Sequence, residues 1–433
     1  MSTPDTLAGW LAWIEAQHPA AIELGLDRVR AVSDAMATGR PGRFVVTIAG
    51  TNGKGSTVAF VEAIARAAGL RVGAYTSPHL LAYTERVRID GRDVDDAALV
   101  AAFARVEVAR AAAERVAGAP LRLTYFEYGT LAALQVFADA ALDLAILEVG
   151  LGGRLDAVNL VDPDVAVITT VDLDHQDWLG PDRESIGREK AGIARAGVPL
   201  VLGEDDPPAS VLRHAYAIGA PAIRGGSDYL FGTTAPGRWN WREPGFELDL
   251  PLPALRGPVQ LRNAATAIAA LRALDVEIPE TAWGAGVASA AIPGRLQHLR
   301  HGGIDVLVDV GHNPQAAGAL SEWLRATPIR GRTHAVYAAL EDKDAAGMVS
   351  ALSADIDGRW HLAGLAHAGP RGGDAASLAR RLAGSAAADA ACHPEVATAV
   401  SAALALAEAG DRVLVFGSFH TAAAALRWAR HGG

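Results

Sequence analysis

The stretch from Val45 to Thr57 constrains the fold of this chain more than any other segment. It reads V-V-T-I-A-G-T-N-G-K-G-S-T, an apolar run followed by a glycine-rich loop and by residues that suit the start of a helix. A strand, a tight loop and a helix in this order form a phosphate cradle, because glycines let backbone N–H groups approach an anion and the helix N-terminus adds a partial positive charge. Lys54 adds a full positive charge. The segment therefore predicts an α/β domain with a phosphate-binding loop.

This loop departs from the common Walker spacing G-x-x-x-x-G-K-[ST]. Six positions before the lysine stands Ile48 where that pattern has glycine, and Gly55 separates Lys54 from Ser56. The departure indicates a phosphate loop of an unusual kind, with its nearest hydroxyl displaced by one residue.

Composition limits the classes of protein to consider. The chain has 433 residues, which predicts two to four domains at roughly 100–200 residues each. Half of the residues are hydrophobic, and the formal net charge of −10 disfavours a general nucleic-acid binder. Cys392 is the single cysteine, which fits a reducing compartment. The first ten residues lack a signal-peptide pattern and no apolar run reaches the roughly 20 residues of a membrane helix, so we expect a cytoplasmic protein with no membrane partner.

From residue 44 onward, short apolar runs alternate with helical stretches, which predicts a doubly wound parallel sheet. Residues 10–36 precede it as a helical preface. Residues 207–258 are richer in Gly, Pro and Trp and are interpreted as an antiparallel flap of the first domain. The segment P-G-R at 293–295 is interpreted as a hinge. We therefore expect a P-loop-containing central domain over residues 1–295 and a smaller Rossmann-like α/β domain over residues 296–433.

Polar residues at the carboxyl ends of the predicted strands are candidates for the site, because ligands of doubly wound sheets bind there. Ser77, Glu148 and the segment 172–175 each follow an apolar run. Glu148 resembles a carboxylate that holds Mg²⁺ beside nucleotide phosphates, and a solvated charge at a strand end is the alternative. Glycines at 150, 152 and 153 favour the metal site, since they allow close approach of the backbone.

His175 and Lys190 give weaker signals. A lone histidine is more often structural, but His175 follows a strand of the same predicted sheet as Glu148, which favours a metal role even though Mg²⁺ prefers oxygen ligands. Lys190 reads as an ordinary lysine on a helix.

The second predicted domain carries two polar strand ends of its own. Asp309, His312 and Asn313 follow its first strand, where capping of the next helix by Asn313 is the competing explanation. Ser418 follows its last strand and is the weaker candidate. We expect substrate contacts at His312 and Ser418.

Nine motifs occur in one order along the chain, namely T-I-A-G-T-N-G-K-G-S-T, Y-T-S-P-H-L, F-E-Y-G-T, L-E-V-G-L-G-G-R-L-D-A-V-N, D-H-Q-D-W-L-G, R-E-K-A-G-I, R-N-A-A-T-A, P-G-R and D-V-G-H-N-P. Together they resemble the dihydrofolate synthase/folylpolyglutamate synthase family, a branch of the Mur-ligase superfamily of ATP-dependent amide ligases. The resemblance runs from about residue 22 to residue 420. The glycine loop is common to Mur ligases, whereas Y-T-S-P-H-L, L-G-G-R-L-D and the early L-G-L are specific to the folate branch.

The resemblance implies roles for individual positions. It implies ATP contacts by Thr51, Asn52, Gly53, Lys54, Gly55, Ser56, Asn263, Arg295 and Asp309. It implies magnesium ligands at Ser77, Glu148, His175 and Lys190, the last as a carbamate. The implied catalytic set is Lys54, Glu148, His175 and Lys190. It implies dihydropteroate contacts by Glu23, Leu24, Gly25, Thr124, Tyr125, Phe126, Glu127, Leu155, Asp156 and Ala157.

The implied reaction uses ATP and Mg²⁺, with two ions, to join L-glutamate to dihydropteroate and to folates through an acyl phosphate. We expect a monomer with these small-molecule substrates and no nucleic-acid partner. One alternative is a Mur ligase that acts on a different carboxylate, against which the segments near Glu23 and Phe126 argue. Another is a nucleotide switch that forms no amide, against which the second α/β block argues.

Overall fold

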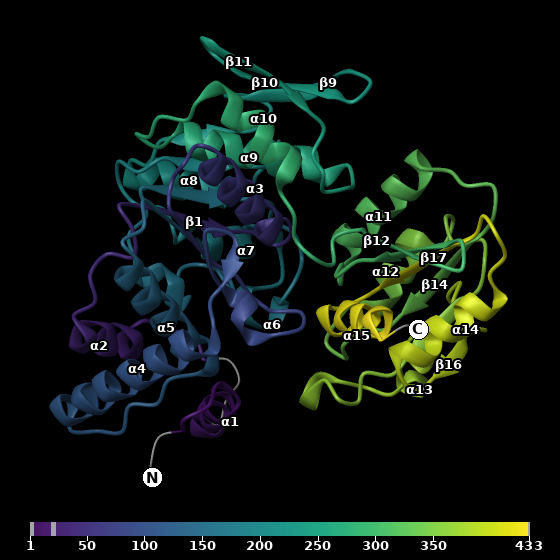
Figure 1. Cartoon of the computed structure of the whole chain (residues 1–433), viewed down its shortest axis with the longest axis horizontal. Helices are drawn as coiled ribbons and strands as arrows, with labels where there is room; N and C mark the ends of the chain where they lie inside the picture. The colour runs from purple at the N-terminus through teal and green to yellow at the C-terminus, as the bar shows by residue number, and fades with distance from the viewer. Residues whose placement is uncertain (1–3, 19–22, 432–433) are drawn as a thin grey trace. The chain divides into compact units, whose positions relative to one another are not determined.

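The computed structural model describes residues 4–18 and 23–431, and residue 22, near which the resemblance starts, lies outside them. The chain forms two compact units (Figure 1). Unit 1 comprises the described residues up to His79 together with Tyr83–Ala254 and Leu261–Ala291, and unit 2 comprises Leu80–Ala82, Leu255–Gln260 and the described residues from Ile292 onward. None of the helices in the described part of the chain has the length and apolar character needed to cross a membrane.

An eight-stranded sheet forms the centre of unit 1, in the order β4-β3-β2-β5-β1-β6-β7-β8. The strands from β2 to β8 in that order pair in parallel, which confirms the predicted doubly wound sheet. β3 and β4 add an antiparallel hairpin, because Asp90 and Gly91 both have positive φ (51° and 73°) and form its tight turn. The strands are β1 (Phe44–Ala49), β2 (Val72–Tyr75), β3 (Val87–Ile89), β4 (Arg92–Asp93), β5 (Leu144–Glu148), β6 (Val165–Ile168), β7 (Leu200–Leu202) and β8 (Ala222–Arg224).

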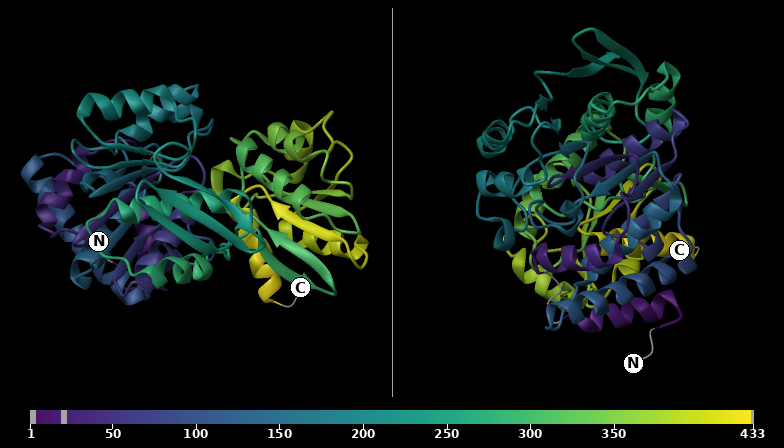
Figure 2. Two further views of the ribbon diagram at one scale, coloured as in Figure 1. Left: turned by 90° about the horizontal axis from the view of Figure 1, so that it is seen from above. Right: turned by 90° about the vertical axis from the view of Figure 1, so that its left-hand side faces the viewer.

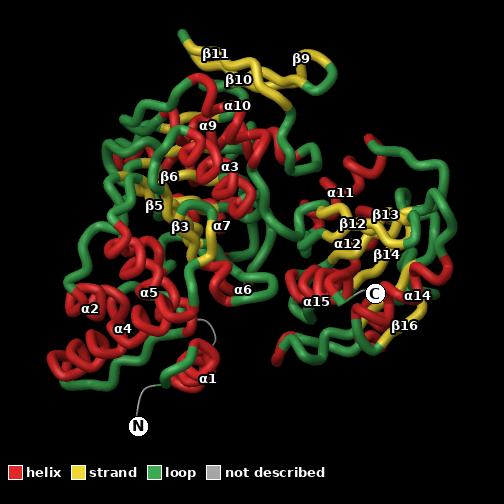
Figure 3. Tube along the Cα trace, in the orientation of Figure 1, coloured by secondary structure: helices red, strands yellow, loops and turns green. Residues whose placement is uncertain are grey.

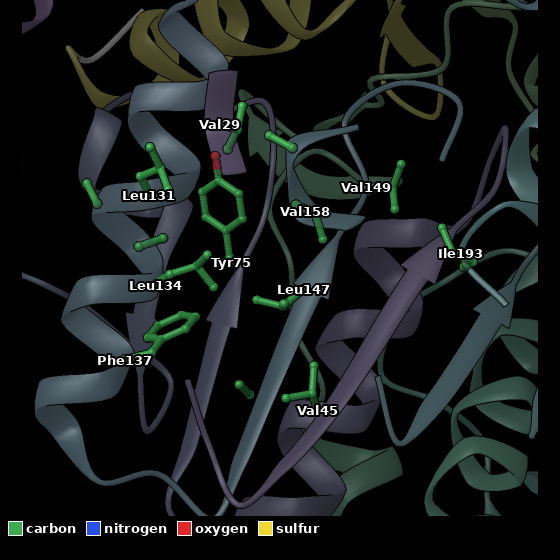
Figure 4. Close-up of a cluster of buried hydrophobic side chains, with 14 of the residues drawn as sticks. Val29, Val45, Tyr75, Leu131, Leu134, Phe137, Leu147, Val149, Val158 and Ile193 are labelled. Atoms are coloured by element: carbon green, nitrogen blue, oxygen red, sulfur yellow. The ribbon is translucent and has the colours of Figure 1, made fainter. Parts of the chain in front are cut away.

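Helices cover this sheet, and every residue of β5 and β6 is buried, as in parallel strands that lie between two layers. On one face Val45, Tyr75 and Leu147 pack with Leu131 and Phe137 (Figure 4). Helix α3 packs on β1, β2 and β5, and α10 packs on α3. The helices are α1 (Leu7–Gln17), α2 (Asp27–Met36), α3 (Lys54–Ala67), α4 (Asp96–Ala117), α5 (Tyr125–Ala140), α6 (Gln176–Leu179), α7 (Arg183–Ala191), α8 (Ala209–Ile218), α9 (Val259–Arg272) and α10 (Glu280–Ser289). The predicted helical preface is thus two helices, α1 and α2.

The prediction of an antiparallel flap over residues 207–258 is wrong for its first part, because α8 and the short strand β8, which pairs in parallel with β7, belong to the central α/β layers. The rest of the flap is a separate three-stranded antiparallel sheet in the order β11-β10-β9, drawn in yellow at the top of Figure 3. Its strands are β9 (Leu230–Ala235), β10 (Arg238–Glu243) and β11 (Phe246–Pro251). Trp239 and Trp241 of β10 are fully buried, and the indole N–H of Trp241 donates to the carbonyl of Ala265 on α9 at 3.0 Å. The flap is therefore anchored to unit 1 through its central strand.

Unit 2 is built on a six-stranded sheet in the order β12-β13-β17-β14-β15-β16. β17, the yellow strand of Figure 2, lies between the green strands β13 and β14 although it is last in sequence. Only the edge strand β12 is antiparallel among the described strands of this sheet, so the Rossmann-like prediction is confirmed. The elements are β12 (Gln297–His301), β13 (Ile304–Val308), α11 (Pro314–Ala326), β14 (Thr333–Tyr337), α12 (Ala345–Leu352), β15 (Trp360–Ala363), α13 (Ala375–Arg381), β16 (Ala391–His393), α14 (Val396–Leu406), β17 (Arg412–Phe416) and α15 (Phe419–Arg430).

Candidate functional site

The phosphate loop of unit 1 connects β1 to α3 and is tightly packed. Gly50 and Gly53 have positive φ values of 152° and 90°. A Cβ at Gly50 would lie 1.8 Å from Oγ1 of Thr169, and a Cβ at Gly53 would lie 2.6 Å from Oδ1 of Asn263. Both positions therefore require glycine. Asn263, on α9, lies directly against the loop.

The N-terminus of α3 carries the positive charge of the loop. Lys54 is the first residue of the helix, and its ammonium donates to the carbonyls of Gly50 at 3.0 Å and Thr51 at 3.3 Å. Gly53 is the N-cap, so no side chain caps this helix, and its first turn contains no acidic residue. Gly55 and Ser56 follow as buried residues of that turn. A helix N-terminus and an ammonium thus serve one anion site.

Glu148 and Ser77 lie together at the carboxyl edge of the same sheet. Glu148 ends β5 with its side chain buried, and Oε2 accepts the backbone N–H of Ser77 at 3.1 Å. Among the described residues, no three His, Cys, Asp or Glu side chains form a ready-made metal cage. Mg²⁺ is usually held by one or two carboxylates with phosphate oxygens and water, so a single carboxylate and a serine beside a phosphate loop are a fitting donor set.

The glycine-rich loop after Glu148 is organised by Asp156. Its Oδ2 accepts the N–H groups of Gly150 (3.0 Å) and Leu151 (2.9 Å), and its Oδ1 accepts that of Val158 (3.0 Å). Burial raises the pKa of Asp156 to about 6. A Cβ at Gly150 would lie 2.7 Å from the ring of Phe126, so Phe126 packs on this loop. The structure therefore joins two of the segments that the resemblance assigns to dihydropteroate.

Lys190 is a buried residue of α7, with only 3% of its surface exposed. Burial and then the positive charge of Lys54 lower its pKa to about 7, whereas the carboxylates of Asp174, Asp156 and Glu204 act in the opposite direction. These charges place the amine in one electrostatic site with the phosphate loop, the Asp156 loop and the segment that leads to His175. An ordinary helical lysine would be exposed and fully charged.

His175 lies on a loop beyond the sheet edge. β6 ends at Ile168, and His175 is the N-cap of α6, in the left-handed conformation with φ of 52°. Its imidazole is about one-third exposed, and its Nε2 lies 3.9 Å from Oδ1 of Asp174. Of the implied magnesium ligands, the structure joins Ser77 and Glu148 by a hydrogen bond and leaves His175 at the more open side of the site.

Arg28 connects two further segments that the resemblance assigns to dihydropteroate. Its guanidinium donates from Nη1 to Glu23 at 2.6 Å and from Nε to Glu127 at 2.9 Å. The Glu127 carboxylate also accepts the N–H of Thr124 at 2.7 Å and completes a capping box at the start of α5. Of the other residues that the resemblance assigns to dihydropteroate, Leu24, Gly25, Tyr125 and Leu155 are partly buried, and Ala157 is buried.

In unit 2, the assigned residues gather where β13 and β17 end side by side. Asp309 accepts the N–H groups of Leu296 (2.8 Å) and Gly311 (2.7 Å), and burial raises its pKa. Arg295 lies 5.3 Å from the ring centroid of Phe419, and the ring of His312 lies 6.2 Å from the same ring.

Ser418 has a local role at this edge of unit 2. Its hydroxyl caps α15 by accepting the N–H of Thr421 at 3.0 Å. Asn313 likewise caps α11 by accepting the N–H of Ala316 at 3.0 Å. Helix capping therefore explains part of both signals seen in the sequence.

Two charged residues described above, Arg28 and Glu204, are not singled out by sequence reasoning. Glu204 lies two residues after the end of β7, and Glu148 is the last residue of β5, so the same strand-end rule would have found Glu204. Lysine occurs at only three of the 39 Lys and Arg positions, Lys54, Lys190 and Lys343. Arginine and lysine are not interchangeable, so a lysine in a chain this rich in arginine indicates a position that needs a compact ammonium or an amine. The rarity of lysine is therefore a signal in the sequence that points to Lys343.

Two models of Mur-ligase domains match the chain. The Mur ligase middle domain matches residues 48–226, and the Mur ligase glutamate ligase domain matches residues 294–419. The chain is 47% identical over 418 residues to the dihydrofolate synthase/folylpolyglutamate synthase of Escherichia coli K12, which covers 96% of this chain and 94% of that protein. It is 34% identical over 387 residues to the protein of the same name from Mycobacterium tuberculosis, covering 82% of this chain and 78% of that protein.

Solved structures match over the whole chain. E. coli FolC in complex with DHPP and ADP has 45% identity and a TM-score of 0.92, covering 100% of this chain and 99% of that one. A bifunctional folylpolyglutamate synthase/dihydrofolate synthase with Mn, AMPPNP and L-glutamate bound has 45% identity and a TM-score of 0.89, covering 99% and 100%. The fold, the ordered motifs and these matches agree, and the chain belongs to the dihydrofolate synthase/folylpolyglutamate synthase family of Mur ligases.

Proposed function

We propose that this protein is an ATP-dependent ligase that joins L-glutamate to 7,8-dihydropteroate and adds further glutamates to tetrahydrofolates. The observation that carries the proposal is the arrangement at the carboxyl edge of the unit 1 sheet, where the phosphate loop with Lys54, the hydrogen-bonded pair of Glu148 and Ser77, and the Asp156 loop packed on Phe126 follow neighbouring strands. Relatives named for both activities, and solved structures of relatives in complex with ADP, AMPPNP, DHPP or L-glutamate, support the same substrates here.

The reaction forms two bonds in turn. A carboxylate oxygen of dihydropteroate attacks the γ-phosphorus of ATP, ADP leaves, and an acyl phosphate results. The amine of L-glutamate then attacks the acyl carbon, phosphate leaves, and the amide forms with loss of a proton from the amine. The first step brings two anions together and transfers no proton, so it requires fixed positive charge more than an acid–base pair.

The residues of unit 1 supply that charge. We assign the phosphates to Lys54 and the N-terminus of α3, and the magnesium site to Ser77, Glu148 and His175. A bound Mg²⁺ neutralises phosphate charge and orients the phosphate oxygens. Asp156 holds the glycine-rich loop against Phe126 and so shapes the site for the pterin substrate.

The carboxyl edge of the unit 2 sheet suits a dicarboxylate. Helices α11, α12 and α15 begin there, and helix N-termini attract anions. The loops are in contact, since Oγ1 of Thr421 donates to the carbonyl of Ala338 at 2.7 Å and a Cβ at Gly347 would lie 2.9 Å from Pro314. We assign L-glutamate to His312, Ser418 and Lys343. Lys343 directly precedes the N-cap of α12.

Lys190→Ala should lower kcat for glutamate ligation at least about tenfold, and added bicarbonate should not restore it. A pKa of about 7 leaves about half of the amine neutral at pH 7. The neutral amine can add to the carbon of carbon dioxide and release one proton to solvent, which gives a carbamate. The carbamate is an anion, so repulsion from Lys54 becomes attraction, and it becomes able to bind a second Mg²⁺. The check is kcat with and without bicarbonate, with a ¹³C NMR search for the carbamate.

Arg188→Ala, on the exposed side of the same helix, is the matched control and should keep full activity. Full activity in Lys190→Ala would show that Lys190 is an ordinary structural lysine.

Arg28→Ala should raise KM for dihydropteroate about tenfold or more, with KM for ATP unchanged. The change removes charge-assisted hydrogen bonds to Glu23 and Glu127 and leaves the buried Glu127 carboxylate without its arginine, each bond being worth about 1.5–3 kcal/mol. Steady-state kinetics with each substrate varied in turn give the measurement, and the exposed neighbour Arg30→Ala is the control. An equal rise in KM for ATP would mean that Arg28 acts on the general fold.

Two competing functions differ from the proposed one in the substrates that must be present for ATP to be consumed. A Mur ligase for another carboxylate would release ADP with a UDP-sugar acid, and a nucleotide switch would release phosphate with no carboxylate or amine present.

We further propose that the protein acts as a monomer in the cytoplasm without a nucleic-acid partner, in keeping with its net charge of −10. Light scattering during turnover tests the monomer.

A further inference from the structure

Glu204 and Arg183 enclose the backbone of one residue, Val171, just ahead of the segment that carries His175. The N–H of Val171 donates to Oε1 of Glu204 at 3.0 Å, and Nε of Arg183 donates to the carbonyl of Val171 at 2.8 Å. Nη2 of Arg183 also donates to Oε2 of Glu204 at 3.1 Å. The three residues form a closed ring of hydrogen bonds, which we call the Val171 clamp.

The residues on either side of Val171 bond in the other direction, to the phosphate loop. The N–H of Thr51 donates to the carbonyl of Thr170 at 2.7 Å, and the N–H of Asp172 donates to Oγ1 of Thr51 at 3.0 Å. The N–H of Asn52 donates to Oγ1 of Thr170 at 3.2 Å. The segment is therefore held between the phosphate loop on one side and the clamp on the other.

The clamp contains a buried carboxyl group, which a mere loop anchor does not need. Glu204 is 9% exposed and lies at the carboxyl end of β7, in the same row of strand ends as Glu148. A buried carboxylate is costly unless it is paired and hydrogen-bonded, and both of its oxygens are engaged here. Burial raises the pKa of Glu204 to about 7 against the opposing charge of Arg183, and the ionised form of Glu204 raises the pKa of Lys190. Glu204 thus influences both the segment of His175 and the amine of Lys190.

We propose that Glu204 and Arg183 are positioning residues for the magnesium and phosphate site. The Val171 clamp holds residues 170–175 in register with the phosphate loop, so that His175 is presented to the ion in one fixed position. Neither residue contacts substrate. The proposal rests on the proposed function only for the identity of the reaction, because metal binding can be measured without turnover.

The test is Mn²⁺ binding to the full-length enzyme in the presence of ADP, followed by electron paramagnetic resonance. Glu204→Ala should weaken Mn²⁺ binding about 10–100-fold, as loss of a residue that orients a metal ligand does, and should raise the Mg²⁺ concentration needed for half-maximal ligation. Glu204→Gln should lose less, because its amide oxygen still accepts the N–H of Val171. Arg183→Ala should add little to Glu204→Ala, because both break one ring. KM for dihydropteroate should not change in these variants.

Asp355→Asn is the matched control, since Asp355 is also a buried carboxylate paired with an arginine, Arg325 at 2.9 Å, but lies in unit 2 beyond α12. It should bind Mn²⁺ like the wild type. If Glu204→Ala does not fold, Arg183→Ala decides, because it removes two of the three hydrogen bonds of the ring. Wild-type Mn²⁺ affinity in the folded variant overturns the proposal. A wild-type enzyme that binds Mn²⁺ but ligates no glutamate would refute the proposed function and leave the test of the clamp intact.

Discussion

Lys54→Ala should abolish glutamate ligation, with kcat reduced by about 10²–10³-fold or more, while the protein stays folded. Lys54 supplies the full positive charge at the start of α3, and loss of one preorganised group that stabilises developing negative charge has effects of this size. Lys54 donates to two loop carbonyls, and the loss of such exchangeable hydrogen bonds should lower the free energy of unfolding by only about 1 kcal/mol. Single-turnover ADP formation and thermal unfolding give the two measurements.

The control for this variant is Arg66→Ala, which removes an exposed cation from the last turn of the same helix. It should ligate glutamate at the wild-type rate. Wild-type turnover in Lys54→Ala would exclude the phosphate-loop assignment, and an unfolded Lys54→Ala would call for Lys54→Met, which keeps the length of the side chain.

Glu148→Gln should reduce kcat by about 10²–10³-fold, because bound metal contributes several kcal/mol of charge stabilisation and 1.36 kcal/mol corresponds to a factor of ten. The amide keeps an oxygen that can accept the N–H of Ser77, so the loop geometry is preserved and only the negative charge is lost. The Mg²⁺ concentration for half-maximal rate should rise in the same variant. Initial rates over a Mg²⁺ titration provide the check.

Glu107→Gln is the control for Glu148→Gln, because Glu107 is a largely buried carboxylate on α4 that pairs with Arg110 at 2.7 Å. It should retain both kcat and Mg²⁺ dependence. A Glu148→Gln enzyme with an unchanged Mg²⁺ dependence would show that Glu148 is a strand-end charge without a metal role.

The sheet architecture could be predicted from the sequence because apolar runs mark fully buried parallel strands. The same logic brought Ser77 and Glu148 together, since neighbouring parallel strands end at one edge, and the structure joins them by a hydrogen bond. β12 was not predicted because Q-H-L-R-H has only one apolar residue, which reflects an edge strand with one exposed side. The β3–β4 hairpin was not predicted because its strands have only three and two residues.

The charged network of the site could be predicted less well, because its partners are far apart in sequence. Arg28 and Glu127 are 99 residues apart, and nothing local to either one indicates the pairing. Lys190 reads as an ordinary lysine since a nine-residue helix does not reveal which polar side chain faces inward. Its burial follows from the packing of α7 on the Asp156 loop, where a Cβ at Gly153 would lie 3.0 Å from the carbonyl of Lys190.

The central claim is that ATP is consumed to join L-glutamate to a pterin carboxylate, and its most direct test is a stoichiometric assay. The enzyme is incubated with ATP and Mg²⁺, with dihydropteroate or tetrahydrofolate, and with or without L-glutamate, while ADP and the pterin product are quantified by mass spectrometry. We predict one ADP for each glutamate added to either pterin, and no sustained ADP formation when the pterin or the glutamate is omitted. ADP formation that proceeds without a pterin, or only with a UDP-sugar acid, would contradict the account.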